Sequence, residues 1–302
     1  KRVVLYDTLI DELTEEEIVN EYKAIKKLAP FENLLLVTGE NPAKAGVPYI
    51  ARALDLAKPY FSNLKIEVMP LKAEEYAELK EHGMNGVICF QETYHKESYL
   101  SLHPTGPKHD YNYHTEAMDR AMQGGIDDVG LGVLFGLDKY RYEFAGLLMH
   151  AEHLEAAFGV GPHTISVPRL RHADDIDPDQ FDNGIDDDTF AKIVACIRIA
   201  VPYTGMIIST RENQQSRERV LHLGISQISG GSRTRRARLR RQQRTPAPQP
   251  GGRRRPPGPV PHRDLADSRR RGASFRRNRR GTHRPMRLRF RSFWFPSIFM
   301  LL

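Results

Sequence analysis

The sequence predicts an α/β protein whose strands and helices form a partial or full (β/α) barrel of the TIM type. Two observations lead to this class. Short apolar runs alternate with longer helix-like segments from about residue 14 to residue 230, which is typical of a parallel sheet with crossover helices. Polar and charged residues also cluster where several apolar runs end, as they do at the active face of such barrels.

The elements are predicted in strict alternation along the chain. A helix begins at Thr14, because Thr14 and Glu17 form a capping box ahead of apolar residues at helical spacing. Helix-like segments closed by Gly124 and Gly159 predict two later helices in the same way. The predicted helices cover residues 14–28, 48–61, 73–82, 110–121, 140–158, 190–200 and 217–223. The predicted strands cover residues 34–37, 65–69, 86–90, 129–134, 163–167, 206–209 and 225–229. An acidic surface loop is predicted over 174–188.

Residues 233–302 differ in composition from the rest of the chain. They contain 22 Arg, no Lys and two acidic residues, a net charge of +20, whereas residues 1–232 carry −13. Because this Arg/Pro/Gly-rich stretch has no helical or strand period, we predict a disordered tail after a barrel domain at 1–232. We interpret the tail as an out-of-frame translation. A nucleic-acid-binding arm is the alternative, since such a charge binds phosphate.

Cysteine use and hydropathy indicate a cytoplasmic protein. Cys89 and Cys196 lie in apolar periodic segments and are predicted to pack in the core as small hydrophobic residues. They offer no disulfide framework, which fits a reducing compartment. No apolar run approaches the roughly 20 residues that span a bilayer. The first residues lack signal-peptide features and an initiating Met, so we expect a truncated start.

Polar residues at four predicted strand ends are the candidate site. Thr38-Gly39-Glu40 follows the first strand, where Gly39 allows close approach to the backbone and Glu40 can accept from an ammonium group. The polar run 91–95 follows the third strand, and Arg169, Arg171 and Arg211 follow later ones. An arginine there can bind a carboxylate with two hydrogen bonds. The alternatives are an ordinary turn, a surface loop, and solvated or salt-bridged arginines.

Two other patterns point to different chemistry. His150 and His153 are three residues apart on a predicted helix and could bind a metal in a barrel hydrolase, although a polar helix face explains them without a third ligand. The glycines between 124 and 136 form neither a GxGxxG nor a P-loop pattern, so a dinucleotide-binding fold is not predicted.

From Leu13 to about Ser232 the chain resembles the tyrosine lyases of the radical S-adenosylmethionine (radical SAM) superfamily. The segments similar to the branch that matures the [FeFe]-hydrogenase cluster are FQETYHKESY, LHPTGPKHDYNYHTEAMDRAM, GGIDDVGLGVLFGL, GLLMHAEHLE, GVGPHTISVPR, AVPYTGMIISTRE and GISQISGGS. Those more similar to the 2-iminoacetate synthases of thiamine thiazole biosynthesis are LLLVTGENPAKAGVPYI and MPLKAEEYAELKEHG. The resemblance therefore leaves the branch open.

This resemblance implies a radical SAM barrel, here without its first strand, that binds a 4Fe-4S cluster and S-adenosylmethionine. The implied reaction abstracts hydrogen from L-tyrosine and cleaves its Cα–Cβ bond to p-cresol and dehydroglycine (2-iminoacetate), with electrons from a donor such as ferredoxin or flavodoxin. We expect neither a membrane nor a nucleic acid as partner. The implied S-adenosylmethionine-binding residues are Thr38, Gly39, Glu40, Gln91, Glu92 and His114. The implied tyrosine-binding residues are Arg169, Ser209 and Arg211.

The chain departs from the family pattern at both ends. The family's CxxxCxxC, which supplies three thiolates to the cluster, precedes the helix that starts at Thr14, and this sequence contains no such motif. After residue 232 the Arg-rich tail replaces the family's last strand and C-terminal domain. Because no reducing cluster is held without those thiolates, we predict no metal ligands and an inactive fragment of a lyase. The alternative is a non-catalytic barrel carrying a nucleic-acid-binding tail.

Overall fold

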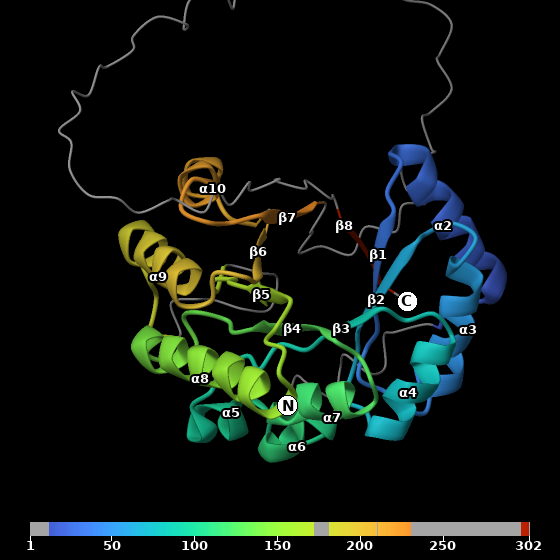
Figure 1. Ribbon diagram of the computed structural model, residues 1–302, viewed down its shortest axis with the longest axis horizontal. Helices are drawn as coiled ribbons and strands as arrows, with labels where there is room; N and C mark the ends of the chain where they lie inside the picture. The colour runs from blue at the N-terminus through green and yellow to red at the C-terminus, as the bar shows by residue number, and fades with distance from the viewer. Residues whose placement is uncertain (1–11, 172–180, 210, 231–296, 302) are drawn as a thin grey trace, which may run out of the picture. The chain divides into compact units, whose positions relative to one another are not determined.

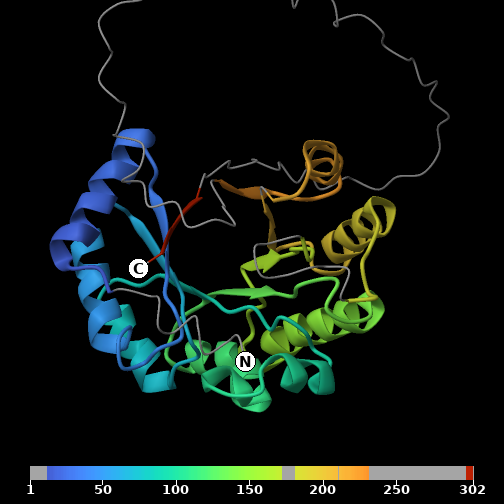
Figure 2. The ribbon, with the colours of Figure 1, turned by 180° about the vertical axis from the view of Figure 1, so that it is seen from behind.

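The computed structural model describes residues 12–171, 181–209, 211–230 and 297–301. Parallel strands follow one another in chain order around a closed barrel, and helices cover its outside (Figures 1 and 2). The strands are β1 (Asn33–Val37), β2 (Asn63–Glu67), β3 (Gly86–Ile88), β4 (Asp128–Gly132), β5 (Thr164–Ser166), β6 (Gly205–Ser209), β7 (Gln227–Gly230) and β8 (Ser297–Leu301). The predicted α/β barrel class is confirmed.

Two helix ends follow the capping signals that the sequence offered. Thr14 accepts from the Glu17 amide at 3.3 Å, and the Glu17 carboxylate accepts from the Thr14 amide at 3.1 Å, which confirms the capping box. Gly159 ends α8 in the left-handed conformation, at φ 75°. The helices are α2 (Glu15–Leu28), α3 (Val47–Ala57), α4 (Ala73–Glu81), α5 (Lys96–Leu102), α6 (Tyr111–Thr115), α7 (Ala117–Gln123), α8 (Tyr140–Phe158), α9 (Asp187–Ala200) and α10 (Gln214–Leu221), with a 3₁₀ turn η1 (Pro107–His109).

Several boundaries differ from the sequence prediction, and three of them illustrate the difference. The helix expected at 110–121 is divided into α6 and α7 at Glu116, whose amide caps α6 by donating to the Asn112 carbonyl. The strand expected at 65–69 ends at Glu67, the last residue that pairs with β1, and Val68 and Met69 are buried in the core beyond it. The helix expected from residue 190 begins at Asp187, because the Asp186 carboxylate caps the Thr189 amide at 2.6 Å.

Alternate residues of each strand face opposite sides of the barrel wall. Leu34, Leu36, Ile66, Val87 and Val129 pack in one continuous core with the surrounding helices. The intervening positions pair across neighbouring strands as a layer that faces the interior: Leu35, Lys65, Gly86 and Asp128. In that layer the Lys65 ammonium lies 2.6 Å from the Asp128 carboxylate, so an ion pair lies in the barrel wall below the mouth.

Strand β8 was not expected from the sequence. Its five residues pair in parallel with β1, from Asn33 with Ser297 to Val37 with Leu301, and two of them pair with β7. The tail between residues 231 and 296, and the part of the acidic loop at 172–180, lie outside the described residues. The domain boundary at 232 and the interpretation of the tail stay predictions.

One core prediction is wrong. Cys196 is exposed on α9, because the buried face of that helix is formed by Phe190, Ile193, Val194 and Ile197. Cys89 is half-buried and packs against the core as predicted. Within the described residues, the structure has no helix with the length and apolar character needed to cross a membrane.

Candidate functional site

Four charged side chains meet at the mouth of the barrel, and we call them the mouth cluster: Glu40, Glu67, Glu92 and Lys108. Glu40 follows β1, Glu67 ends β2, and Glu92 follows β3. Because these strands are parallel, their carboxyl ends lie at one edge of the sheet. Lys108 comes from η1, and its Nζ lies 3.1 Å from Glu40 Oε1 and 3.1 Å from Glu92 Oε1.

The electrostatics of the mouth cluster are dominated by its carboxylates. Burial alone would lower the pKa of Lys108, but Glu92 and Glu40 outweigh it and raise that pKa, so the ammonium stays charged. Burial, followed by the charge of Glu92, raises the pKa of Glu67 to about 7, against the opposing effects of Lys108 and Arg211. Three carboxyl groups therefore share one lysine, and the cluster has a negative charge at neutral pH.

Glu92 is the one non-glycine residue with a positive φ in the described part of the chain, at 65°. Its carbonyl accepts from the Leu134 amide at 2.9 Å, and the preceding Gln91 amide donates to the Gly132 carbonyl at 2.9 Å. Such a conformation is costly for a residue with a Cβ and persists only where the surroundings enforce it. These hydrogen bonds therefore hold the Glu92 backbone in a conformation that an unconstrained loop would rarely adopt.

A buried carboxylate from α8 clamps the same loop from outside the barrel. Glu143 is fully buried, and it accepts from the Thr93 hydroxyl and, at 2.8 Å, from the Tyr94 amide. Burial raises the pKa of Glu143, although both hydrogen bonds oppose the shift. The Tyr94 carbonyl also accepts from the Tyr111 hydroxyl at 2.7 Å. These contacts fix the residues immediately after Glu92, so the loop is rigid where it enters the mouth.

Ser209 and Arg211 lie together at the end of β6. The Ser209 hydroxyl accepts from the Arg211 amide at 3.2 Å and from Arg211 Nε at 3.4 Å. Arg211 is exposed, and its charge acts on Glu67, which places it on the mouth side of the barrel. The structure thus brings these two predicted substrate-binding residues next to each other.

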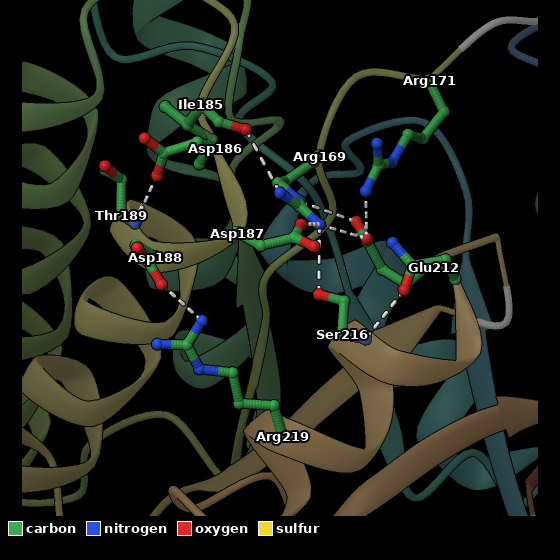
Figure 3. A network of polar contacts seen from close by, with 11 residues as sticks. Arg169, Arg171, Ile185, Asp186, Asp187, Asp188, Thr189, Glu212, Ser216 and Arg219 are labelled. Atoms are coloured by element: carbon green, nitrogen blue, oxygen red, sulfur yellow. Dashed lines mark hydrogen bonds and ion pairs between the residues drawn. The ribbon is translucent and has the colours of Figure 1, made fainter.

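Arg169 has a different environment (Figure 3). It donates to Glu212 with Nε at 3.0 Å and Nη2 at 2.5 Å, to Asp187 at 2.7 Å and to the Ile185 carbonyl at 3.1 Å. Its guanidinium also stacks 4.2 Å above the Phe190 ring, and Arg171 shares Glu212. We call Arg169, Arg171, Asp187 and Glu212 the Arg169 network. Its partners lie at the start of α9 and just before α10, so Arg169 joins these two helices to the end of β5.

Three predicted cofactor-facing residues have protein surroundings. Gln91 is buried and donates to the Thr115 hydroxyl at 2.9 Å. His114 Nε2 donates to the Phe90 carbonyl at 2.9 Å, and burial lowers the His114 pKa to about 4, so its ring is neutral. Thr38 Oγ1 and His114 Nδ1 are buried atoms without a hydrogen-bond partner among the described residues. Whether these residues contact a cofactor stays a prediction.

The histidine pair of α8 does not converge on one point. His150 Nδ1 lies 3.0 Å from the Tyr94 hydroxyl, whereas His153 Nε2 lies 2.6 Å from Asp119. Burial lowers the pKa of His150 to about 4. In the described part of the chain no group of three or more His, Cys, Asp or Glu side chains could hold a metal ion.

Sequence reasoning missed three residues that build this site: Glu67, Lys108 and Glu143. Glu67 is the charged end of a strand whose interior-facing positions alternate with apolar ones, so strict alternation could have identified it. Lys108 lies in a loop with no periodic pattern, and Glu143 is one of several polar residues in the first turns of α8. For these two, no local signal distinguishes a buried or site-facing charge from a solvated one.

The two implied cofactors differ in how well the chain fits them. Glu40 and Glu92 already bind one ammonium group, that of Lys108, so carboxylates suited to a methionyl ammonium are present. A 4Fe-4S cluster needs three or four thiolates. The chain has two cysteines, one beside β3 and one exposed on α9. The residues of this chain therefore do not fit the cluster, and we derive no step through it.

Curated proteins similar to the chain are 2-iminoacetate synthases. Those of Escherichia coli (strain K12) and Salmonella typhimurium (strain LT2) are each 38% identical over 224 residues, which cover 74% of this chain and 58% of the relative. The chain thus spans a little over half the length of these relatives. Residues 166–267 also match the Biotin and Thiamin Synthesis associated domain.

Solved structures extend this similarity to the hydrogenase maturase branch. The crystal structure of HydG, a maturase of the [FeFe]-hydrogenase, is 47% identical with a TM-score of 0.70, covering 72% of this chain and 49% of that one. HydG from Carboxydothermus hydrogenoformans is 40% identical with a TM-score of 0.68, covering 74% and 52%. Methylornithine synthase (PylB), at 21% identity and a TM-score of 0.57, shares the fold. Over about three quarters of its length, the chain is thus similar to the radical SAM tyrosine lyases of both branches, the 2-iminoacetate synthases and HydG.

Proposed function

We propose that this chain forms the cofactor- and substrate-binding wall of a radical SAM lyase that cleaves the Cα–Cβ bond of L-tyrosine to p-cresol and dehydroglycine. The observation that carries the proposal is the Glu40–Glu92 carboxylate pair, which holds an ammonium group at the barrel mouth in a chain similar to 2-iminoacetate synthase and HydG. Dehydroglycine, which is 2-iminoacetate, serves either branch, so the proposal does not depend on choosing one.

The charge of the mouth cluster suits S-adenosylmethionine. That ligand has an α-ammonium group, a sulfonium and one carboxylate, a net charge of +1. The cluster offers three carboxyl groups to one lysine, and opposite potentials favour both encounter and binding. In this proposal Glu40 accepts from the methionyl ammonium, and Glu92 has its carboxylate fixed in the mouth by its backbone conformation. When bound, S-adenosylmethionine supplies the group that abstracts hydrogen from the substrate.

Arg211 is the proposed partner of the tyrosine carboxylate. It is exposed at the end of β6, next to the Ser209 hydroxyl, and a guanidinium can bind a carboxylate with two parallel hydrogen bonds. Arg169 could bind the tyrosine carboxylate only by giving up its present contacts, because its Nε, Nη1 and Nη2 all donate to protein acceptors. We therefore assign Arg169 to the scaffold that supports the substrate side of the mouth.

We further propose that the chain binds these ligands without turning them over. The thiolates that a cluster requires are not among its residues, and ferredoxin or flavodoxin as electron donor is meaningful only where a cluster is present. A product assay for p-cresol after anaerobic incubation with iron, sulfide, S-adenosylmethionine, tyrosine and dithionite tests this point. Formation of p-cresol above a protein-free control would contradict it.

Isothermal titration with S-adenosylmethionine tests the binding function. We expect saturable binding to the chain, and Glu40→Gln should weaken it about tenfold or more, because a charge-assisted hydrogen bond is lost. Glu78→Gln is the matched control, since Glu78 is exposed on α4, and it should bind as the unmodified chain does. Absence of saturable binding at millimolar ligand, or equal affinity of the two variants, would refute the proposal.

A further inference from the structure

Lys108 lies in an exposed connection, and its side chain extends from there into the mouth of the barrel. Residues 104–107 and 109–110 around it are exposed, whereas the Lys108 side chain is 25% exposed and lies between Glu40 and Glu92. Gly106, at φ 87°, turns the chain into η1 just before it. A lysine ammonium has three N–H donors. Among the described residues two carboxylates account for two of them, and the third donor is available to a ligand.

An adjacent carboxylate and ammonium complement the head of an α-amino acid. Such a head has an ammonium and a carboxylate on one carbon atom, so its two charges are separated by about one hydrogen-bond length. Glu40 Oε1 and Lys108 Nζ are 3.1 Å apart. Placed beside this pair with opposite polarity, the head would donate to Glu40 and accept from Lys108. Both ligand charges would then be neutralised without moving either side chain.

The proposed reaction brings two amino-acid heads into the mouth, and therefore two carboxylates. Two cationic side chains act on Glu67 at the mouth, Lys108 and Arg211. They come from opposite parts of the barrel wall, since Lys108 bonds to residues after β1 and β3 while Arg211 follows β6. If Arg211 binds the tyrosine carboxylate, Lys108 is the cation beside the carboxylates proposed to bind the other head.

We propose that Lys108 binds the methionyl carboxylate of S-adenosylmethionine and so selects a ligand with an intact amino-acid head. This inference rests on the proposed function of Glu40. Lys108 also keeps Glu40 and Glu92 in place, because without its charge the two carboxylates would repel each other and any bound anion. The residue is thus both a ligand-binding group and the counter-ion of the site.

The experiment compares S-adenosylmethionine with decarboxylated S-adenosylmethionine, which lacks the carboxylate and keeps both positive charges. Both ligands are titrated calorimetrically into the unmodified chain, Lys108→Met, Lys108→Arg and Lys58→Met. Lys58 is the matched control, because its ion pair with Asp55 lies at the surface end of α3. Circular dichroism verifies that each variant is folded.

We expect the unmodified chain and Lys58→Met to prefer S-adenosylmethionine. Lys108→Met should bind it about tenfold or more weakly, and should bind the decarboxylated ligand at least as well as before, because the uncompensated carboxylates attract cations. Lys108→Arg should restore part of the preference. An unchanged preference in Lys108→Met, or tighter binding of S-adenosylmethionine by that variant, would overturn the inference while leaving the proposed function intact. Failure of the unmodified chain to bind S-adenosylmethionine would instead refute the proposed function.

Discussion

The mouth cluster and the Arg169 network both combine carboxyl groups with basic side chains at the same edge of the barrel, but their charges are balanced differently. The Arg169 network pairs two arginines with two carboxylates, and both Arg169 and Glu212 have side chains at most 3% exposed. The mouth cluster sets three carboxyl groups against one lysine, and Lys108, Glu40 and Glu92 are each about a quarter exposed. A neutral network built around a buried Arg169–Glu212 pair joins elements, whereas a partly exposed cluster with excess negative charge can bind a ligand.

The two pKa directions express the same difference. Burial alone would raise the pKa of Glu212, but the hydrogen bonds from Arg169 and Arg171 outweigh it and lower that pKa. Burial, followed by the charge of Glu92, raises the pKa of Glu67 to about 7, and Lys108 and Arg211 offset this rise only in part. In the network a carboxylate is stabilised as an anion, whereas at the mouth an anion is kept at a cost to stability. That cost is typical of sites prepared for a ligand of opposite charge.

The largest expected effect comes from breaking the Arg169 network. Arg169→Met leaves Glu212 buried with only the half-exposed Arg171 as a partner. Removing one member of a buried ion pair costs about 3–5 kcal/mol, so we expect the free energy of unfolding to fall by about 3 kcal/mol in urea titrations. Arg211→Met is the control, and because Arg211 is exposed it should change stability by less than about 0.5 kcal/mol. Equal losses in the two variants would show that the network is not structural.

Glu67 provides the next largest effect, on the pH dependence of stability. Its folded pKa of about 7 exceeds the ordinary value of 4.5, so between these values the folded state binds more protons than the unfolded state. Stability should therefore fall as pH rises from about 4.5 to 7, by on the order of 3 kcal/mol for this residue. The difference between the unmodified chain and Glu67→Gln, measured by urea unfolding at pH 5 and pH 8, isolates this contribution from those of the histidines.

Glu212 calibrates that measurement, because its pKa is shifted in the opposite direction. With a folded pKa below 4.5, its stabilisation is fully present above pH 4.5 and is lost only as pH falls further. The network thus contributes equally at pH 5 and pH 8. If Glu67→Gln showed the same loss of stability between these pH values as the unmodified chain, Glu67 would not be the strained carboxyl of the mouth.

How much of this comparison was predictable depends on the range of the interactions involved. The alternation of elements, the capping box at Thr14 and the stop at Gly159 are local, and the structure confirms them. The charged residues after β1, β3, β5 and β6 were also found from the sequence. What separates Arg169 from Arg211 is whether carboxylates from α9 and from the segment before α10 reach them, and no local pattern contains that information.

The same limit explains the errors and omissions. Cys196 lies in an apolar run, but the packed face of α9 excludes it. Strand β8 is a short apolar segment separated from β1 by more than 250 residues, and its pairing is decided by the free edges of β1 and β7. Lys108 belongs to the mouth because Glu40 and Glu92 converge on it from two different strands. Each of these depends on contacts between elements distant in sequence.

The smallest expected effect separates the strain at Glu92 from its charge. Glu92→Gln and Glu92→Gly both remove the ion pair with Lys108, but only glycine relieves the backbone at φ 65°. Glycine has no Cβ and so relieves the cost of the left-handed conformation, although it also loses more backbone entropy on folding. On balance, Glu92→Gly should be more stable than Glu92→Gln by roughly 0.5–1 kcal/mol in urea titrations. At Glu78, inside α4, the same pair should give the opposite order, because glycine destabilises a helix by about 1 kcal/mol.

The reversal between the two positions is the decisive outcome, because it depends on backbone conformation alone. If glycine were also the less stable choice at position 92, the clamp by Glu143 would hold the loop without strain, and Glu92 would be an ordinary turn residue that happens to face Lys108. If the reversal is found, the chain retains a carboxylate at a position where glycine is more stable. A residue that lowers the stability of the fold at its position is explained by a role in ligand binding. Ligand binding is also the property that distinguishes the mouth cluster from the Arg169 network.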